Sequence, residues 1–371
     1  MKRWIVFCIT CFFVTGYAQE YDFCITYPSG RTLCYIITSP NTVKIGSSNK
    51  QTGTGILGLG VYDYDFVGSL TVPATVTDNG DTYTVTNIDN LRRTGLTTVK
   101  LPETITIISK RAFSYCKKMT EINFPNSLDS IGEEAFWGCN ALISVNIPSS
   151  VRYLGSAAFR NCNNLISATI GSEIVDGSSY AILVGGGAFQ NCESLQKVVI
   201  LSSVRQIGDF SFLSCANLKD IVIEDGVENI GRYVFEDCSS LGGIALPSSI
   251  RSIGTGAFSG CSSIRNIIIP EGCNHLGNGV FEGCRRLRSV KLPKAWCETI
   301  IADLKNPRRT MDMRTYSKSD FASNFKDCPS LERIIIPMGM FETFAALLPE
   351  YKDKFVEEEG RDNLDGGQKI Y

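Results

Sequence analysis

The chain has 371 residues, of which 43% are hydrophobic and 20% are charged. This composition excludes a disordered or collagen-like chain and indicates one that folds around an apolar core. The 36 Lys and Arg residues nearly balance the 38 Asp and Glu residues. A net charge of -2 provides no broad positive field, so neither nucleic acid nor an anionic membrane surface is an expected partner.

Residues 1–18 are predicted to be a signal peptide. Lys2 and Arg3 precede an apolar run over residues 4–14, and small residues such as Ala18 follow it. The run is too short for a stable membrane anchor, which needs about 20 residues. We therefore expect an exported chain that is not inserted in a membrane after cleavage, located at the cell surface, outside the cell or in a periplasm.

Residues 19–90 are predicted to form an N-terminal β-cap. Strand-forming residues over 21–37 and around the turn at 78–81 indicate two hairpins. If residues 28–30 form the loop of the first hairpin, Cys24 faces Cys34, and a cross-strand disulfide is expected in an oxidising compartment. The alternative is that Cys24 and Cys34 remain unbonded and act as two separate apolar side chains. Such a cap would cover the exposed end of a repeat array.

Residues 91–293 carry an internal repeat with a period of 23 residues. Its marker is a Phe placed three residues before a Cys, and one unit is 7 residues longer and another 21 residues longer than the period. The nine pairs are Phe113 and Cys116, Phe136 and Cys139, Phe159 and Cys162, Phe189 and Cys192, Phe212 and Cys215, Phe235 and Cys238, Phe258 and Cys261, Phe281 and Cys284, and Phe325 and Cys328.

Each unit also predicts its own local structure. An apolar residue and a short alternation such as Ile267–Ile269 follow the Cys, which indicates a β-strand, and a Pro often ends it. An Ile-Gly or Leu-Gly pair comes next, where Gly permits a turn into the Phe segment. Because so short a unit cannot bury its apolar residues alone, neighbouring units must stack with equivalent strands about 4.8 Å apart in a parallel sheet.

The pattern Cys-x-x-Leu-x-x-Ile-x-Ile-Pro, followed by Ile-Gly-x-x-Ala-Phe-x-x-Cys, resembles the BspA-type leucine-rich repeats of secreted and surface-associated bacterial proteins. The resemblance covers about residues 91–293 and 325–337. It implies an α/β solenoid, a right-handed leucine-rich-repeat superhelix with a parallel β-sheet on one face. It also implies a non-catalytic binding protein, since some family members are adhesins for host matrix proteins. The motif specifies the scaffold and leaves the ligand open.

Two segments interrupt or follow the repeats. Residues 294–324 form an insertion with a short helix predicted over 296–304. Residues 325–371 comprise the last repeat and a C-terminal helical cap, in which one or two amphipathic helices over 341–358 are broken at Pro349. Together with the N-terminal β-hairpin cap, this segment closes the solenoid.

The repeat cysteines are the first candidates for metal or redox chemistry. One thiol per 23 residues leaves no close Cys-x-x-Cys pair, and no His partners accompany them. Equivalent stacked positions also present parallel side chains, a poor match to disulfide geometry. We therefore predict buried free thiols that pack as small apolar side chains, and no metal or other cofactor.

No catalytic residue is predicted. The lone His275 occupies a position that is polar in the other repeats, which indicates a surface residue and leaves no other His for a relay. The glycines at 185–187 lack the Lys and Ser/Thr of a phosphate loop and are predicted to form a flexible turn in the seven-residue insertion. No Asp or Glu recurs on neighbouring units, so we expect no enzyme.

The predicted sheet places the fourth, fifth and seventh residues after each Cys on its outer face. Four consecutive units carry apolar side chains at the seventh position, where Asn and Thr stand earlier, and glycines and cations lie beside them. We predict that this face binds a ligand, with β-strand propensity alone as the alternative explanation of its residues. The face consists of Val199, Val222, Ala245, Ile268, Gly242, Gly243, Lys219, Arg265 and Arg288.

The sequence thus predicts an exported, non-enzymatic recognition protein that binds a host or microbial surface protein. A glycan is the alternative ligand, but the outward strand positions have no aromatic residue to stack on a sugar ring. A structural or self-assembling envelope component is a second alternative.

Overall fold

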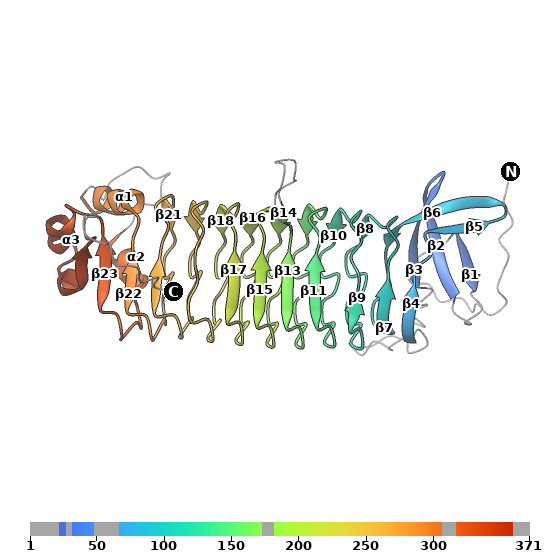
Figure 1. Ribbon diagram of the computed structural model, residues 1–371, viewed down its shortest axis with the longest axis horizontal. Coiled ribbons are helices and arrows are strands. Elements are labelled where there is room, and N and C mark those ends of the chain that lie inside the picture. Colours follow the sequence, from blue (N-terminus) through green and yellow to red (C-terminus); the bar gives the residue numbers. More distant parts are fainter. Residues whose placement is uncertain (1–21, 27–31, 48–66, 173–181, 306–316, 359–371) are drawn as a thin grey trace, which may run out of the picture.

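The computed structural model describes residues 22–26, 32–47, 67–172, 182–305 and 317–358. Over these ranges the repeats stack into a long solenoid, with a β-rich cap at one end and helices at the other (Figure 1). The solenoid and its caps match the predicted fold class. The predicted signal peptide lies outside the described residues, and the exact domain boundaries stay a prediction.

The N-terminal cap is built from antiparallel hairpins. Strand β1 pairs with β2, β2 with β3 and β5 with β6, and β3 then runs parallel to β6. Cys24 and Cys34 are direct partners in the first hairpin and are linked by a disulfide bond. The bounds are β1 Phe23–Thr26, β2 Thr32–Ser39, β3 Thr42–Ser47, β5 Thr75–Asp78 and β6 Asp81–Ile88.

After every repeat Cys except Cys238 comes a strand that contributes to a parallel sheet along the solenoid. The ladder is divided into three sheets, β4-β7-β9, β11-β13-β15-β17 and β20-β22-β23-β24. The repeat predicts one continuous sheet, and the structure differs from this prediction because the ladder is interrupted twice. The bounds are β4 Val67–Thr71, β7 Gly95–Lys100, β9 Glu121–Ile122, β11 Ser144–Ile147, β13 Ser167–Ile170, β15 Lys197–Ile200, β17 Asp220–Ile223, β20 Asn266–Ile268, β22 Ser289–Lys291, β23 Arg333–Ile336 and β24 Phe355–Glu357.

A second parallel ladder, which the sequence did not predict, runs along another side of the rungs and joins β6 of the cap. It contains the residues immediately before the repeat glycines. Its members are β8 Ile107–Ile108, β10 Ser130–Ile131, β12 Tyr153–Leu154, β14 Ile182–Val184, β16 Val204–Ile207, β18 Asn229–Ile230, β19 Ser252–Ile253 and β21 His275–Leu276.

The glycines of this ladder serve close packing. A Cβ at Gly155 would lie 2.4 Å from the backbone N of Glu133, and a Cβ at Gly254 would lie 2.6 Å from the backbone N of Arg232. Consecutive rungs therefore approach backbone to backbone at this point. The predicted reason, a turn that needs glycine, was wrong for these positions because none of them has a positive φ. Gly185 occupies the same position in a regular rung, so the 185–187 segment is not part of the insertion.

The Phe residues of the repeats form a continuous stack through the core. Neighbouring ring centroids from Phe113 to Phe325 lie 4.9–6.2 Å apart, and the ring planes differ by at most 17°. The rings from Phe113 to Phe281 are almost completely buried. Each contributes about 1.5–3 kcal/mol by burial of apolar area, so the stack holds every rung to the next.

The C-terminal end combines helices with a final strand. The helices are α1 Lys294–Lys305, α2 Lys318–Ser323, α3 Phe341–Leu347 and the 3-10 helix η1 Pro349–Lys354. The prediction of helix to residue 358 was wrong at its end, because β24 pairs in parallel with β23 and adds one more strand to the sheet. Phe355 and Phe344 pack with centroids 5.2 Å apart, which explains why the chain turns back onto the last rung.

Candidate binding face

The alternation of each strand sorts its side chains into core and surface. In β15, Val198 and Ile200 are buried while Val199 lies outward and half-buried. In β17, Ile223 is buried and Val222 is 49% exposed. Val199 and Val222 are direct partners in the parallel pairing, so the predicted row of apolar residues starts as neighbours on one face.

The row continues beyond β17. Ala245 is exposed. The bulky residues on the two flanking rungs are Val222 and Ile268, and Ile268 is the more exposed of them, at 63%. Lys291 is the strand partner of Ile268 on the far side. We define the sheet face as the nine residues predicted for binding, which are Val199, Val222, Ala245, Ile268, Gly242, Gly243, Lys219, Arg265 and Arg288; Val199 is half-buried and the other eight are exposed.

The sheet is interrupted at the centre of this face. Residues 242–246 form no strand, and within the described ranges their backbone makes no hydrogen bond to either neighbouring rung. The expectation of a regular sheet was therefore wrong here. A Cβ at Gly242 or Gly243 would touch nothing within 4 Å, and glycine weakens a strand because it has no side chain to pack against the adjacent strands.

The same rung remains attached elsewhere. In the second ladder Asn229 pairs with Ser252, and the N–H of Phe235 donates to the carbonyl of Ala257 at 2.8 Å. The repeat is thus open only on its sheet side. Strand β17 and strand β20 present unpaired edges toward residues 242–246.

A shallow groove of about 480 Å³ adjoins the interruption, where Ala245 and Leu246 meet the end of β17. Its acidic side chains are already engaged: Glu224 accepts from the N–H of Ser202, and Asp225 accepts from the hydroxyl of Ser248. The groove therefore adds apolar surface next to Ala245. Its full lining is Ser202, Ile223, Glu224, Asp225, Ala245, Leu246 and Pro247.

Cations border the apolar row. Lys219 and Arg265 are exposed and have no ion-pair partner within 4 Å among the described residues. The third cation, Arg288, forms a long ion pair with Glu332, with Nε 3.9 Å from Oε1. The unpaired cations Lys219 and Arg265 leave positive charge on either side of the interruption, where it can attract acidic groups of a ligand.

Sequence reasoning missed part of this surface. Ile143 is 49% exposed and Ile166 is 43% exposed, at the fourth position after their cysteines. The same positional rule that selected Lys219 would have found them, had it been applied to the earlier repeats. Val356, which is 40% exposed, had no such signal because its strand β24 was not predicted.

The repeat thiols are buried and act as hydrogen-bond donors within the core. The S–H of Cys215 donates to the carbonyl of Phe189 at 3.2 Å, and the S–H of Cys261 donates to the carbonyl of Phe235 at 3.0 Å. Burial raises the pKa of Cys192 from 9.0 to about 12. The thiolate needed for redox or metal chemistry is thus disfavoured, and the described residues contain no cluster of His, Cys, Asp and Glu suited to a metal ion.

Sequence comparison agrees with this architecture. Six copies of the BspA type leucine rich repeat region match residues 89–184 and 182–302, together more than half of the chain. The chain belongs to the BspA-type leucine-rich-repeat family. The resemblance seen in the Phe and Cys motifs is thereby confirmed. No curated protein sequence matches the chain.

Several solved structures are similar to this BspA-type chain. The Treponema pallidum leucine-rich-repeat protein is 20% identical over 61% of this chain and 90% of its own, with a TM-score of 0.42. The pneumococcal vaccine antigen PcpA is 16% identical over 92% and 100%, with a TM-score of 0.39. A leucine-rich cell surface protein from Faecalibacterium prausnitzii is 22% identical over 89% and 98%, with a TM-score of 0.34.

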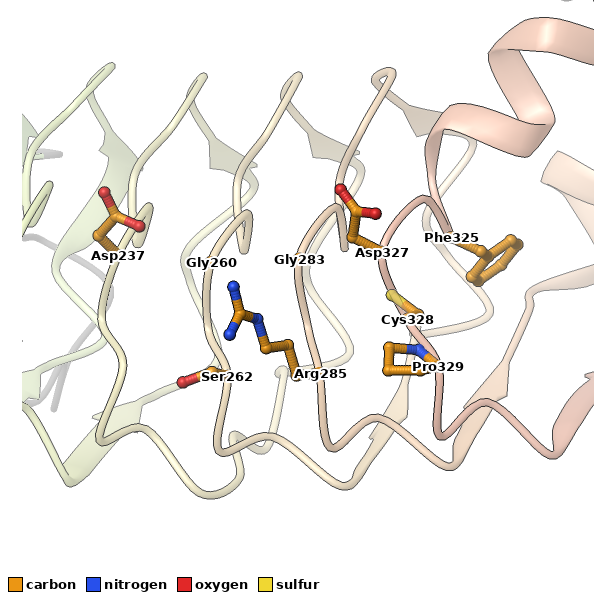
Figure 2. Close-up of a pocket in the computed structure, with 9 residues that line it drawn as sticks. All are labelled: Asp237, Gly260, Ser262, Gly283, Arg285, Phe325, Asp327, Cys328 and Pro329. Carbon is orange, nitrogen blue, oxygen red and sulfur yellow. The ribbon is translucent and has the colours of Figure 1, made fainter.

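A second hollow, of about 1020 Å³ and open to solvent, lies on the surface of the BspA-type rungs near the C-terminal end. Figure 2 shows Asp237 and Asp327 on either side of Gly260 and Gly283, with Arg285 between them. Gly260 and Gly283 leave the space, because they stand one residue before their cysteines, where most other repeats have a side chain. The lining includes no histidine, and His275 is exposed on β21 as predicted.

Among the described residues of this BspA-type chain, no helix is both long enough and apolar enough to cross a bilayer.

Proposed function

We propose that the chain is an exported, non-enzymatic recognition protein that binds a surface protein of a host or of another microbe through the sheet face. The observation that carries the proposal is the pair Val222 and Ile268, which are 49% and 63% exposed on either side of an interrupted rung. Large apolar side chains exposed together on a rigid surface are typical of interaction sites.

The composition of the face supports a protein ligand. An apolar centre bordered by the cations Lys219 and Arg265 resembles a protein interface, in which a desolvated core is surrounded by a polar rim. No outward position of the sheet strands β11, β13, β15, β17, β20, β22 and β23 holds an aromatic residue. A sugar ring would therefore find no stacking partner on this face.

The absence of catalysis in the proposal also has a physical basis. The repeat thiols are protonated at neutral pH, because burial raises their pKa values, for example that of Cys116 from 9.0 to about 11. The single His lies on β21, away from the sheet face. The predicted signal peptide and the family together support a location at the cell surface.

The test is binding of the purified chain, after removal of residues 1–18, to arrays of extracellular-matrix proteins and of glycans. The variant Ala245→Arg places a charge at the centre of the apolar row, and Gly243→Arg does so with no steric conflict within 4 Å of the new Cβ. We expect a protein ligand to be lost in both, because a buried unpaired charge costs several kcal/mol, while the melting temperature changes little.

The matched control is Ser239→Arg, which adds the same charge to the same rung at an exposed position outside the face. It should bind as the unmodified chain does. Unchanged binding by Ala245→Arg would refute the proposed site. A ligand found only among the glycans would favour the alternative of sugar recognition, and concentration-dependent light scattering would favour a self-assembling envelope component.

A further inference from the structure

Phe210 and Tyr233 form an aromatic pair away from the sheet face, in the segments that follow β16 and β18. Their ring centroids lie 5.4 Å apart and their planes differ by 8°. Phe210 is 38% exposed and Tyr233 is partly exposed. The pair is separate from the buried Phe stack and closes no part of the core.

The backbone at both residues is in the left-handed region. The φ angle is +62° at Phe210 and +55° at Tyr233, whereas the equivalent residues of the flanking rungs are Gly187 at +64° and Gly256 at +62°. Bulky residues are strained in this region and glycine is not. Arg111, Glu134 and Ala157 have a positive φ at the same position of earlier rungs, so this conformation belongs to the repeat, and what distinguishes Phe210 and Tyr233 is an aromatic ring that remains at least partly exposed.

The flanking glycines leave the pair uncovered. A Cβ at Gly256 would lie 2.3 Å from Cδ1 of Tyr233, so the ring extends over this glycine. On the other side, a Cβ at Gly187 would have only atoms of Gln190 within 4 Å, so the Phe210 ring makes no contact at that point, and Phe210 is 38% exposed. The stack thus has open surface at the Phe210 end.

A fixed ion pair lies next to the rings. Arg232 donates from Nε to Oδ2 of Asp209 at 2.9 Å, and its backbone N–H donates to Oδ1 at 2.7 Å. Asp209 precedes Phe210 in the chain and Arg232 precedes Tyr233. The two charges neutralise each other, yet both side chains are partly exposed, at 34% and 65%. A ligand here needs hydrogen-bonding groups but no net charge.

We infer that Phe210, Tyr233 and the Asp209–Arg232 pair form a binding site for a neutral pyranose sugar. The negative face of an aromatic ring attracts C–H groups, which a pyranose presents on its ring faces. Its hydroxyls can donate to the carboxylate and accept from the guanidinium, and hydrogen bonds to charged groups are the stronger kind. This site is independent of the protein ligand proposed for the sheet face.

The test is saturation-transfer NMR on the full chain with neutral oligosaccharides of glucose, galactose and N-acetylglucosamine. Phe210→Gly and Tyr233→Gly each remove one ring and place glycine where neighbouring rungs already have it, so both variants should keep the fold. We expect transfer to the sugar ring protons in the unmodified chain and affinity weakened by about tenfold or more in each variant.

Two controls separate this site from other surfaces. Tyr153→Ala removes an aromatic residue that is 45% exposed on β12, and Ala245→Arg alters the sheet face; both should bind sugar normally. Phe210→Gly should leave any protein ligand of the sheet face bound. The inference is overturned if no sugar of the panel shows transfer, if Phe210→Gly binds sugar unchanged, or if a proline-rich peptide binds the rings and sugars do not.

Discussion

The sheet from β11 to β17 and the rung that follows it share one repeat motif but differ in hydrogen bonding. Val198 and Ile221 lie in an uninterrupted parallel ladder, whereas the rung at residues 242–246 has no ladder partner among the described residues. Both regions keep the Phe stack, with Phe212 and Phe235 5.6 Å apart. The comparison teaches that the core and the second ladder hold the rungs, so the sheet face can vary for binding.

The largest predicted effect concerns the buried thiols that both regions share. The eleven described free cysteines are buried, and burial raises their pKa values, for instance that of Cys328 from 9.0 to about 11. In the unfolded chain they ionise near pH 9, so the protonated folded state is fully stable below pH 9 and loses stability as pH rises toward 11. In this pH range each buried thiol lowers the free energy of unfolding by about 1.4 kcal/mol per pH unit.

Summed over the cysteines, this loss is on the order of 10 kcal/mol at pH 10, comparable to the whole stability of a domain. We expect cooperative unfolding between pH 9 and 11, measured by far-UV circular dichroism. Replacing Cys192 and Cys215 with Ala should make the transition less steep by about two protons. Native dichroism retained through pH 11 would contradict the role of the thiols.

The next effect tests whether the Phe stack holds the open rung as firmly as the closed ones. Phe235→Ala removes a fully buried ring from the open rung, and Phe136→Ala does so in the closed region. We expect each to lower the free energy of unfolding by about 3–5 kcal/mol because a cavity is left, as measured by urea denaturation. Phe210→Ala, at an exposed ring, should cost far less. A loss at Phe235 much smaller than at Phe136 would mean that the open rung is held differently.

The smallest effect compares two glycines of one rung. Gly254→Ala should destabilise the chain by about 1–3 kcal/mol because its Cβ would lie 2.6 Å from the backbone of the preceding rung. Gly243→Ala meets nothing within 4 Å and should leave stability unchanged or raise it by about 0.4–1 kcal/mol. Differential scanning calorimetry of both variants decides this. Equal melting temperatures would show that the second ladder does not hold the rung.

Several features could be predicted from the sequence because they recur in fixed phase. The spacing of Phe and Cys placed the core, the alternation after each Cys placed the outward residues, and the facing Cys24 and Cys34 followed from one hairpin. The interruption at Gly242 and Gly243 could not be predicted in the same way. Whether a ladder bond forms depends on the distance between rungs, which the stacking of the whole array determines.

The second ladder and the aromatic pair show the same limit. From the sequence, the Gly of each Ile-Gly or Leu-Gly pair is predicted to permit a turn. The structure shows that neighbouring rungs meet backbone to backbone at these glycines, for example at Gly155. Phe210 and Tyr233 are 23 residues apart, and only stacking of the rungs brings their rings to 5.4 Å. The strand β24 escaped prediction because its pairing with β23 needs the preceding helices to turn the chain back.

The sequence by itself determined the repeat, the solenoid and the identity of the buried and outward positions, because hydrophobic periodicity specifies which side chains must leave water. The tertiary structure decided where the ladder opens, which thiols meet the carbonyls of Phe residues on the preceding rung, and which exposed side chains become neighbours. These properties depend on distances between residues of different rungs, and local pattern along one rung carries no information about them.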